Sequence, residues 1–123
     1  MEIQYAIFCE DISYGKALTL KTPISSLEVS MLSAVKQFDM PLFVTTIGGK
    51  KGTKYKLTIE TTSGWGVSDK ADFDFVWRAN KLTQGDYFII HLKPIHIGTH
   101  IFNLYIDRKP KAKIKLPIRE AKN

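Results

Sequence analysis

Residues 53–61, TKYKLTIET, alternate polar and apolar side chains with a period of two. In an extended chain Tyr55, Leu57 and Ile59 lie on one face, and the lysine, threonine and glutamate side chains between them lie on the other. Such alternation is typical of a β-strand that buries one face and exposes the other to solvent. The stretch therefore predicts a half-buried strand.

The same alternation returns along most of the chain. It is clear in ADFDFVW (71–77) and GTHIFNLYID (98–107). Further candidate strands rich in β-branched or aromatic residues lie at residues 2–9, 16–21, 41–47 and 86–92. Turns with glycine or proline separate many of these runs, and GGKKGTK (48–54) is expected to be a hairpin connection. Seven or eight short strands predict an all-β fold, an antiparallel β-sandwich.

One segment departs from this pattern. In SSLEVSMLSAVKQF (25–38), Ser25 and Glu28 have the spacing of a helix-capping box, and apolar residues follow near helical spacing. The serine and valine residues of this segment are poor helix formers. We therefore expect either a short helix or an irregular crossover between the two sheets.

Composition limits the class of protein. With 123 residues and 44% hydrophobic side chains the chain has apolar material for one core, and a single domain over residues 1–123 is expected. Glu2 stands where a secretory signal carries Lys or Arg, and no segment approaches the roughly 18 apolar residues of a membrane span. The lone Cys9 excludes an internal disulfide framework. These features predict a cytoplasmic protein that does not bind membranes.

The formal net charge of +6 is unevenly distributed. Residues 1–107 contain 11 basic and 11 acidic residues, whereas residues 108–123 contain 7 basic residues and 1 acidic residue. The C-terminal stretch therefore carries the whole excess of positive charge, and any partner attracted by charge is expected to meet the chain there.

A period of two also organises the end of the chain. In KAKIKLPI, Lys111, Lys113 and Lys115 alternate with apolar residues, which predicts a last strand paired with residues 99–107 as a hairpin. The lysine row and Pro117 are typical of an edge strand that is protected against aggregation. Two alternatives stay open, because the row could also bind nucleic-acid phosphates or an acidic protein surface.

The final third, GDYFIIHLKPIHIGTHIFNLYIDRKPKAKIKLPI (85–118), resembles the closing strands of an uncharacterised family of small immunoglobulin-like β-sandwich proteins from bacteria and phages. The positions that carry this resemblance are Gly98, Thr99, Phe102, Leu104, Ile106, Asp107, Leu116, Pro117 and Ile118. GKALTLKTPISSLEV (15–29) is similar to the family's second strand and crossover. The resemblance implies an immunoglobulin-like fold; it implies no catalytic or binding residues, since the family has no assigned activity.

Candidate residues for catalysis or metal binding are few. His91, His96 and His100 lie close in sequence and neutral imidazoles bind zinc, but their spacing does not place them on one face of a strand. Cys9 alternates with apolar residues, which indicates a small buried side chain rather than a reactive thiol. No phosphate-binding loop, nucleophile elbow or pair of catalytic carboxylates is present in the sequence. We therefore expect no enzymatic activity, no cofactor and no metal.

The loop TSGWGVSD (62–69) presents Trp65 between two glycines. A tryptophan on a loop tip can stack on a sugar ring or fill a pocket of a partner, and it can also fold back to cap the end of the sandwich. The sequence leaves both interpretations open.

These patterns favour a non-catalytic interaction module of bacterial or phage origin. It would bind a protein partner, or a second copy of itself, through loops or an edge strand. A nucleic-acid-binding protein that uses Lys111, Lys113 and Lys115 is one alternative, and a carbohydrate-binding sandwich that uses Trp65 is another.

Overall fold

A computed structural model describes residues 1–14, 18–24, 27–29, 38–62, 68–92 and 98–120 of the chain. These residues form nine strands: β1 (Glu2–Tyr14), β2 (Leu18–Ile24), β3 (Leu27–Val29), β4 (Phe38–Ile47), β5 (Lys54–Thr62), β6 (Ser68–Val76), β7 (Thr83–Leu92), β8 (Gly98–Ile106) and β9 (Lys109–Glu120). The all-β fold class is thus confirmed, with nine strands in the described residues rather than seven or eight.

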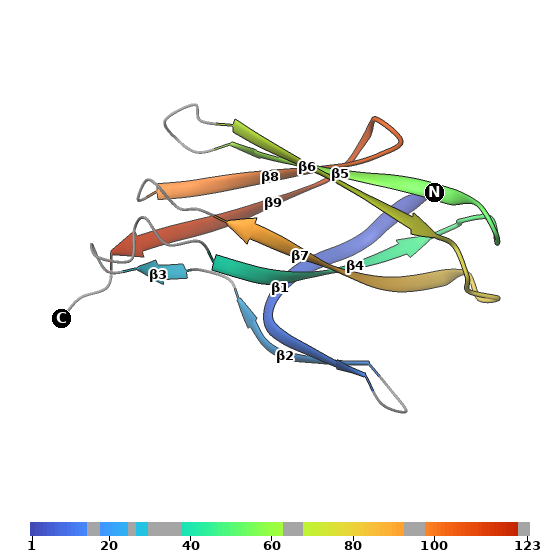
Figure 1. Cartoon of the computed structure of the whole chain (residues 1–123), viewed down its shortest axis with the longest axis horizontal. Helices are drawn as coiled ribbons and strands as arrows, with labels where there is room; N and C mark the ends of the chain where they lie inside the picture. Colours follow the sequence, from blue (N-terminus) through green and yellow to red (C-terminus); the bar gives the residue numbers. More distant parts are fainter. Residues whose placement is uncertain (15–17, 25–26, 30–37, 63–67, 93–97, 121–123) are drawn as a thin grey trace.

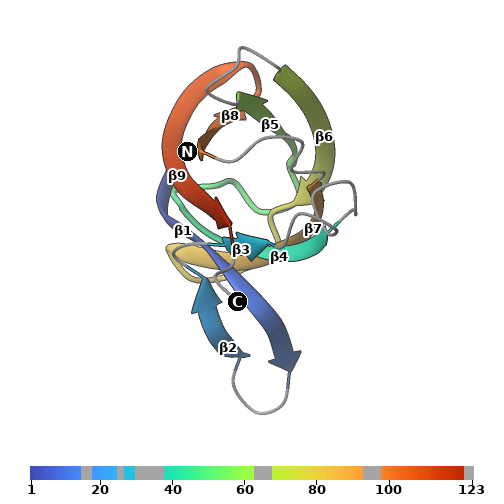
Figure 2. The ribbon, with the colours of Figure 1, turned by 90° about the vertical axis from the view of Figure 1, so that its left-hand side faces the viewer.

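The strands form two sheets that face each other (Figures 1 and 2). One sheet has four strands in the order β2-β1-β4-β7, and the other has five in the order β3-β9-β8-β5-β6. All pairs are antiparallel except β3–β9, which is parallel. Figure 2 shows that β1 runs out of the sandwich into the β1–β2 hairpin, which projects beyond the opposing sheet. The architecture is consistent with the predicted β-sandwich.

Side chains from both inner faces meet in the core. Leu57 and Ile59 on β5 are buried while their neighbours are more exposed, and Phe102 and Leu104 on β8 repeat the pattern. Phe8 of the four-stranded sheet packs edge-on against Phe102 of the five-stranded sheet, with ring centroids 4.8 Å apart. Burying each large apolar side chain contributes about 1.5–3 kcal/mol to the stability of the fold.

Of the two alternatives for residues 25–38, the helix is wrong where the structure describes that segment, whereas the chain does cross between the sheets there, since β2 and β4 lie in one sheet and β3 in the other. Leu27–Val29 forms β3, which pairs in parallel with residues 118–120 of β9. Three residues are too short to show a strand periodicity in the sequence, so this strand depends on its partner rather than on local preference. The rest of the predicted segment, residues 25–26 and 30–37, lies outside the described residues.

The expected hairpin at residues 48–54 is also wrong. The chain does turn there, but β4 and β5 belong to different sheets and do not pair, so the turn is a crossover between the two layers. Gly49 lies against Trp77, and a Cβ atom on Gly49 would be 2.1 Å from Cε3 of that indole. The glycine therefore allows the crossover to approach the residue that follows β6.

The predicted final hairpin is confirmed. β8 and β9 pair antiparallel from Gly98↔Ile118 to Ile106↔Lys109. Asp107 and Arg108 make the two-residue turn with φ values of 48° and 71°, as a type I′ turn requires. The turn is held on β5, because the backbone N–H of Lys56 donates to Oδ1 of Asp107 and the Asp107 N–H donates to the Lys56 carbonyl, both at 3.0 Å.

Candidate functional site

Strand β7 forms one edge of the four-stranded sheet. Its ten residues pair with β4 in one unbroken register, from Thr83↔Ile47 to Leu92↔Phe38. Across the described residues no strand pairs with the side of β7 that faces away from β4. That side of β7 is therefore an edge of the sheet, to which another strand can be added.

The second half of this edge is mostly apolar in sequence. Residues 87–92 read YFIIHL and contain no proline and no acidic or lysine side chain. Phe88 and Ile90 are buried in the core, whereas Tyr87 and Ile89 point outward and are 44% and 37% exposed. A long, apolar free edge of this kind is a template for pairing with another chain.

The other free edges differ from β7. Strand β6 ends the five-stranded sheet, and its exposed side chains include three aspartates and a lysine: Asp69, Lys70, Asp72 and Asp74. Strand β2 contains Lys21 and Pro23, and β3 has only three residues. Charge, proline and short length are the usual protections of a sheet edge. Among the described edges, β7 beyond Asp86 lacks them.

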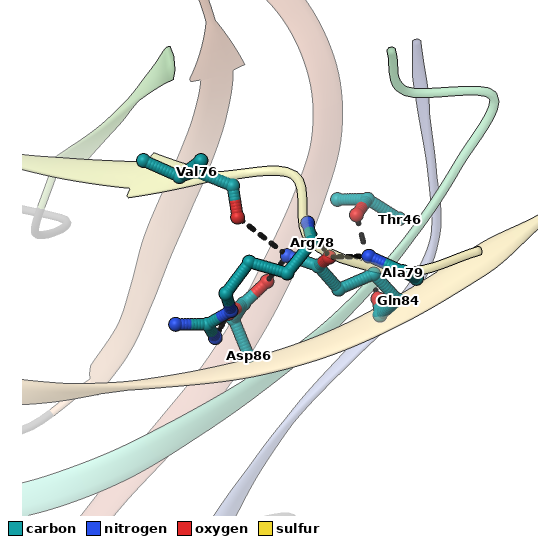
Figure 3. A network of polar contacts seen from close by, with 6 residues as sticks. All are labelled: Thr46, Val76, Arg78, Ala79, Gln84 and Asp86. Atoms are coloured by element: carbon teal, nitrogen blue, oxygen red, sulfur yellow. Dashed lines mark hydrogen bonds and ion pairs between the residues drawn. The ribbon is translucent and has the colours of Figure 1, made fainter. Parts of the chain in front are cut away.

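A polar network occupies the first half of β7 (Figure 3). The side-chain carbonyl of Gln84 accepts hydrogen bonds from the backbone N–H groups of Arg78 and Ala79, and its amide nitrogen donates to the Val76 carbonyl and to Asp86. Arg78 also bonds Asp86, at 3.2 Å. The network fixes the loop between β6 and β7, and its members on β7 are Gln84 and Asp86, so it does not extend into residues 87–92.

A cleft of about 430 Å³ lies beside this network, between the edges of β6 and β7. It is lined by apolar residues, Phe73, Phe75, Val76, Tyr87 and Phe88, and by four charged ones, Lys54, Asp74, Arg78 and Asp86. The aromatic rings touch across the gap between the sheets, since the Phe73 and Phe88 centroids are 5.2 Å apart. A strand added to β7 would direct every second side chain toward this cleft.

The outer face beside β7 is apolar as well. Tyr87 pairs in register with Phe43 of β4, and Phe43 pairs with Ile7 of β1. Tyr5 of β1 packs on Phe43 with ring centroids 5.9 Å apart and is itself 50% exposed. Phe43 itself is only 5% exposed, so the exposed apolar side chains of this face are Tyr5 on β1 and Tyr87 and Ile89 at the edge.

The lysine row of β9 is divided in the structure. Lys113 and Lys115 are exposed, whereas Lys111 is the extra residue where the β8–β9 register shifts, and its side chain is only 14% exposed. Its Nζ donates to Oε1 of Glu2 at 2.7 Å, and this hydrogen bond is the main cause of the lowered pKa of Glu2. Two lysines of the three therefore point freely into solvent from β9.

Further cations lie at the end of the sandwich where β5 begins. Lys50 and Lys51 are exposed on the β4–β5 turn, Lys81 is exposed on the β6–β7 loop, and Arg108 is exposed at the β8–β9 turn. Hydrogen bonds join the first two segments, including Lys51 Nζ to Asn80 Oδ1 at 2.7 Å. Lys54, in contrast, is paired with Asp74 at 3.5 Å.

The two described histidines, His91 and His100, lie in different sheets. Nδ1 of His91 on β7 lies 2.5 Å from Oδ1 of Asp39, and His100 is buried on β8 in the other sheet. Within the described ranges no group of three or more His, Cys, Asp or Glu side chains could hold a metal ion. Cys9 is buried, as predicted, with its Sγ 3.7 Å from the Pro41 carbonyl. His96 and Trp65 lie outside the described residues.

No protein-family model and no curated protein matches this chain. Among the described residues there is also no helix with the length and hydrophobicity that a membrane crossing requires.

Sequence reasoning missed the two features that define this edge. The run YFIIHL is predicted only as a strand. Six residues without proline, Asp, Glu, Lys or Arg also indicate an edge that pairs readily with another chain. Gln84 was not singled out. The alternation that places Phe88 and Ile90 inward also places Gln84 and Asp86 inward, and two polar side chains at inward positions signal a buried network.

Proposed function

We propose that this chain is a non-catalytic interaction module that binds a protein by adding a strand to the free edge of β7. The observation that carries the proposal is the contrast between β7, which has no Asp, Glu, Lys or Arg from Tyr87 to Leu92, and the charged edge of β6. In strand addition the main-chain hydrogen bonds supply affinity, and pockets for alternate side chains supply specificity.

The edge of β7 offers both main-chain hydrogen bonds and a cleft for side chains. Each added main-chain hydrogen bond contributes about 0.5–1.5 kcal/mol net. A bound strand would place one set of side chains over Tyr87 and Ile89 and the other set toward the cleft at Phe88. The preferred ligand is therefore an extended segment without charges at its centre.

We further propose that the protein is an immunoglobulin-like member of the bacterial and phage family that its final third resembles, and that it works in the cytoplasm. The two facing sheets and the β8–β9 hairpin support the first part. A single, buried cysteine fits a reducing compartment and supports the second.

Selection from a random peptide library tests strand addition. Peptides are selected on the wild-type protein, with the Ile89→Lys variant as counter-selection, and the amide chemical shifts of the complex are measured. We expect alternating apolar peptides that perturb the amides of β7. Peptides that bind both proteins equally well, or that perturb amides elsewhere, contradict the proposal.

A second candidate function is binding of nucleic-acid phosphates. The exposed Lys113 and Lys115, with the cations of the loop end, favour it. Binding would weaken steeply with salt, with a slope in log K of roughly −0.9 per phosphate neutralised on duplex DNA. Changing Lys113 and Lys115 to Gln should reduce that slope by about two, and an unchanged slope would remove β9 from the interface.

A further inference from the structure

We infer that the strand which completes the β7 edge comes from β7 of a second copy of this chain, paired antiparallel about a two-fold axis at Ile89. This inference rests on the proposed strand addition at β7. It names the partner, the register and the symmetry, and each of the three follows from a separate property of the edge.

The register follows from the pattern of inward and outward side chains. Two antiparallel copies of one strand must pair residues of the same face, so the axis passes through a residue and not between two. An axis at Phe88 would set Asp86 opposite Ile90 of the other copy and bring a carboxylate into the middle of the apolar segment. An axis at Ile89 sets Phe88 opposite Ile90 and leaves Asp86 at the margin.

The outer face is self-complementary in the same register. Ile89 meets Ile89 of the other copy, and Tyr87 lies opposite His91. Pairs of β-branched or aromatic side chains directly opposite each other contribute about 0.2–1 kcal/mol each. The contact covers Tyr87 and Ile89, two of the most exposed large hydrophobic side chains of the described chain.

The charge distribution favours a second copy over a foreign partner. The excess of positive charge lies in residues 108–123, and β9 belongs to the other sheet. The described part of β7 has one ionised carboxylate, that of Asp86, which Arg78 already binds. Two cationic chains can therefore meet at β7, where Asp86 is paired with Arg78 and the exposed carboxylate of Asp39 lies against Nδ1 of His91, whereas an acidic partner would be drawn toward β9.

Sedimentation velocity of the full chain, from low-micromolar to millimolar concentration, tests for the dimer. We expect a reversible monomer–dimer equilibrium in the wild type. Ile89→Lys should raise the dissociation constant roughly tenfold or more, because two ammonium groups would face each other at the axis. Leu82→Lys is the matched control, since Leu82 is 68% exposed on the β6–β7 loop and lies outside the contact; it should leave the equilibrium unchanged.

Disulfide formation tests the register independently. Directly opposite residues at the axis have Cβ atoms about 4.5–5.5 Å apart, so Ile89→Cys should form an intermolecular disulfide rapidly with oxidised glutathione. Leu82→Cys should react slowly, and Cys9 is buried and should give no background. Faster cross-linking through Tyr87→Cys than through Ile89→Cys would overturn the axis at Ile89.

The outcomes separate this inference from the proposed function. A wild-type protein that stays monomeric at millimolar concentration, with no preferential cross-linking at residue 89, overturns the dimer. If peptides selected on the same protein still bind β7, strand addition stands without self-pairing. If they do not, both proposals fail.

Discussion

The side-chain carbonyl of Gln84 accepts a hydrogen bond from the backbone N–H of Arg78 at 2.6 Å. A buried side chain at the start of β7 thus holds the loop that leaves β6. The same oxygen binds the N–H of Ala79 at 2.9 Å, and the amide nitrogen donates to the Val76 carbonyl at 3.0 Å. One glutamine therefore satisfies three backbone groups that would otherwise lose their partners.

Replacing Gln84 by Ala should lower the free energy of unfolding by about 1–3 kcal/mol, because it leaves partly buried backbone groups unsatisfied. Chemical denaturation measures the change. Gln4→Ala serves as the control, since Gln4 is exposed on β1 and should change stability by less than about 0.5 kcal/mol. Equal effects of the two substitutions would show that the network contributes nothing to the fold.

Gly49→Ala should destabilise the protein by about 1–3 kcal/mol, because the added methyl group collides with the Trp77 ring and the crossover must shift. Thermal unfolding measures the loss. The same substitution should cost less in a Trp77→Phe background, where the ring is smaller. A cost that does not depend on residue 77 would place the strain elsewhere in the turn.

Arg108→Gly should raise the free energy of unfolding by about 0.5–1 kcal/mol, because a glycine tolerates the φ of 71° that an arginine adopts only with strain. Asp-Gly is also among the pairs preferred in type I′ turns. Lys109→Gly is the matched control and should destabilise, since residue 109 lies in β9. A loss of stability in Arg108→Gly would contradict this account of the turn.

Periodicity predicted the strands that bury one face and missed the features that depend on distant contacts. β5, β8 and β9 alternate between core and solvent, so their residue patterns indicated their place in the fold. On β4, in contrast, every residue from Met40 to Thr46 is buried. A strand buried on both faces shows no alternation of apolar and polar residues, so its sequence does not indicate which side chains face the core. β3 forms because it pairs with β9, which its own three residues do not indicate. The glycines of residues 48–54 predict a turn but do not distinguish a hairpin from a connection between two sheets.

Lys111 is a single residue whose orientation the alternation of the sequence predicted wrongly. Alternation placed Lys111 with Lys113 and Lys115, but the register shift in β9 turns Lys111 toward Glu2. A β-bulge depends on how two strands fit together, and single-strand periodicity cannot indicate it.

The Glu2–Lys111 pair should make stability depend on pH in the acid range. Lys111 lowers the pKa of Glu2 in the folded protein, so the pair stabilises fully above the ordinary pKa of glutamate. That contribution is lost as the pH falls through the lowered value. Urea unfolding at neutral and acid pH should show wild type and Lys111→Gln converging at acid pH, with Lys113→Gln as the control. A gap that persists below the lowered pKa would point to packing of the Lys111 stem instead.

The parallel pairing of β3 with β9 joins segments roughly ninety residues apart, and such long-range contacts slow folding. On a ribosome, residues 27–29 emerge long before residues 118–120. The short strand therefore has no partner until β9 has been synthesised, so the pairing of β3 with β9 must follow the synthesis of every other described strand.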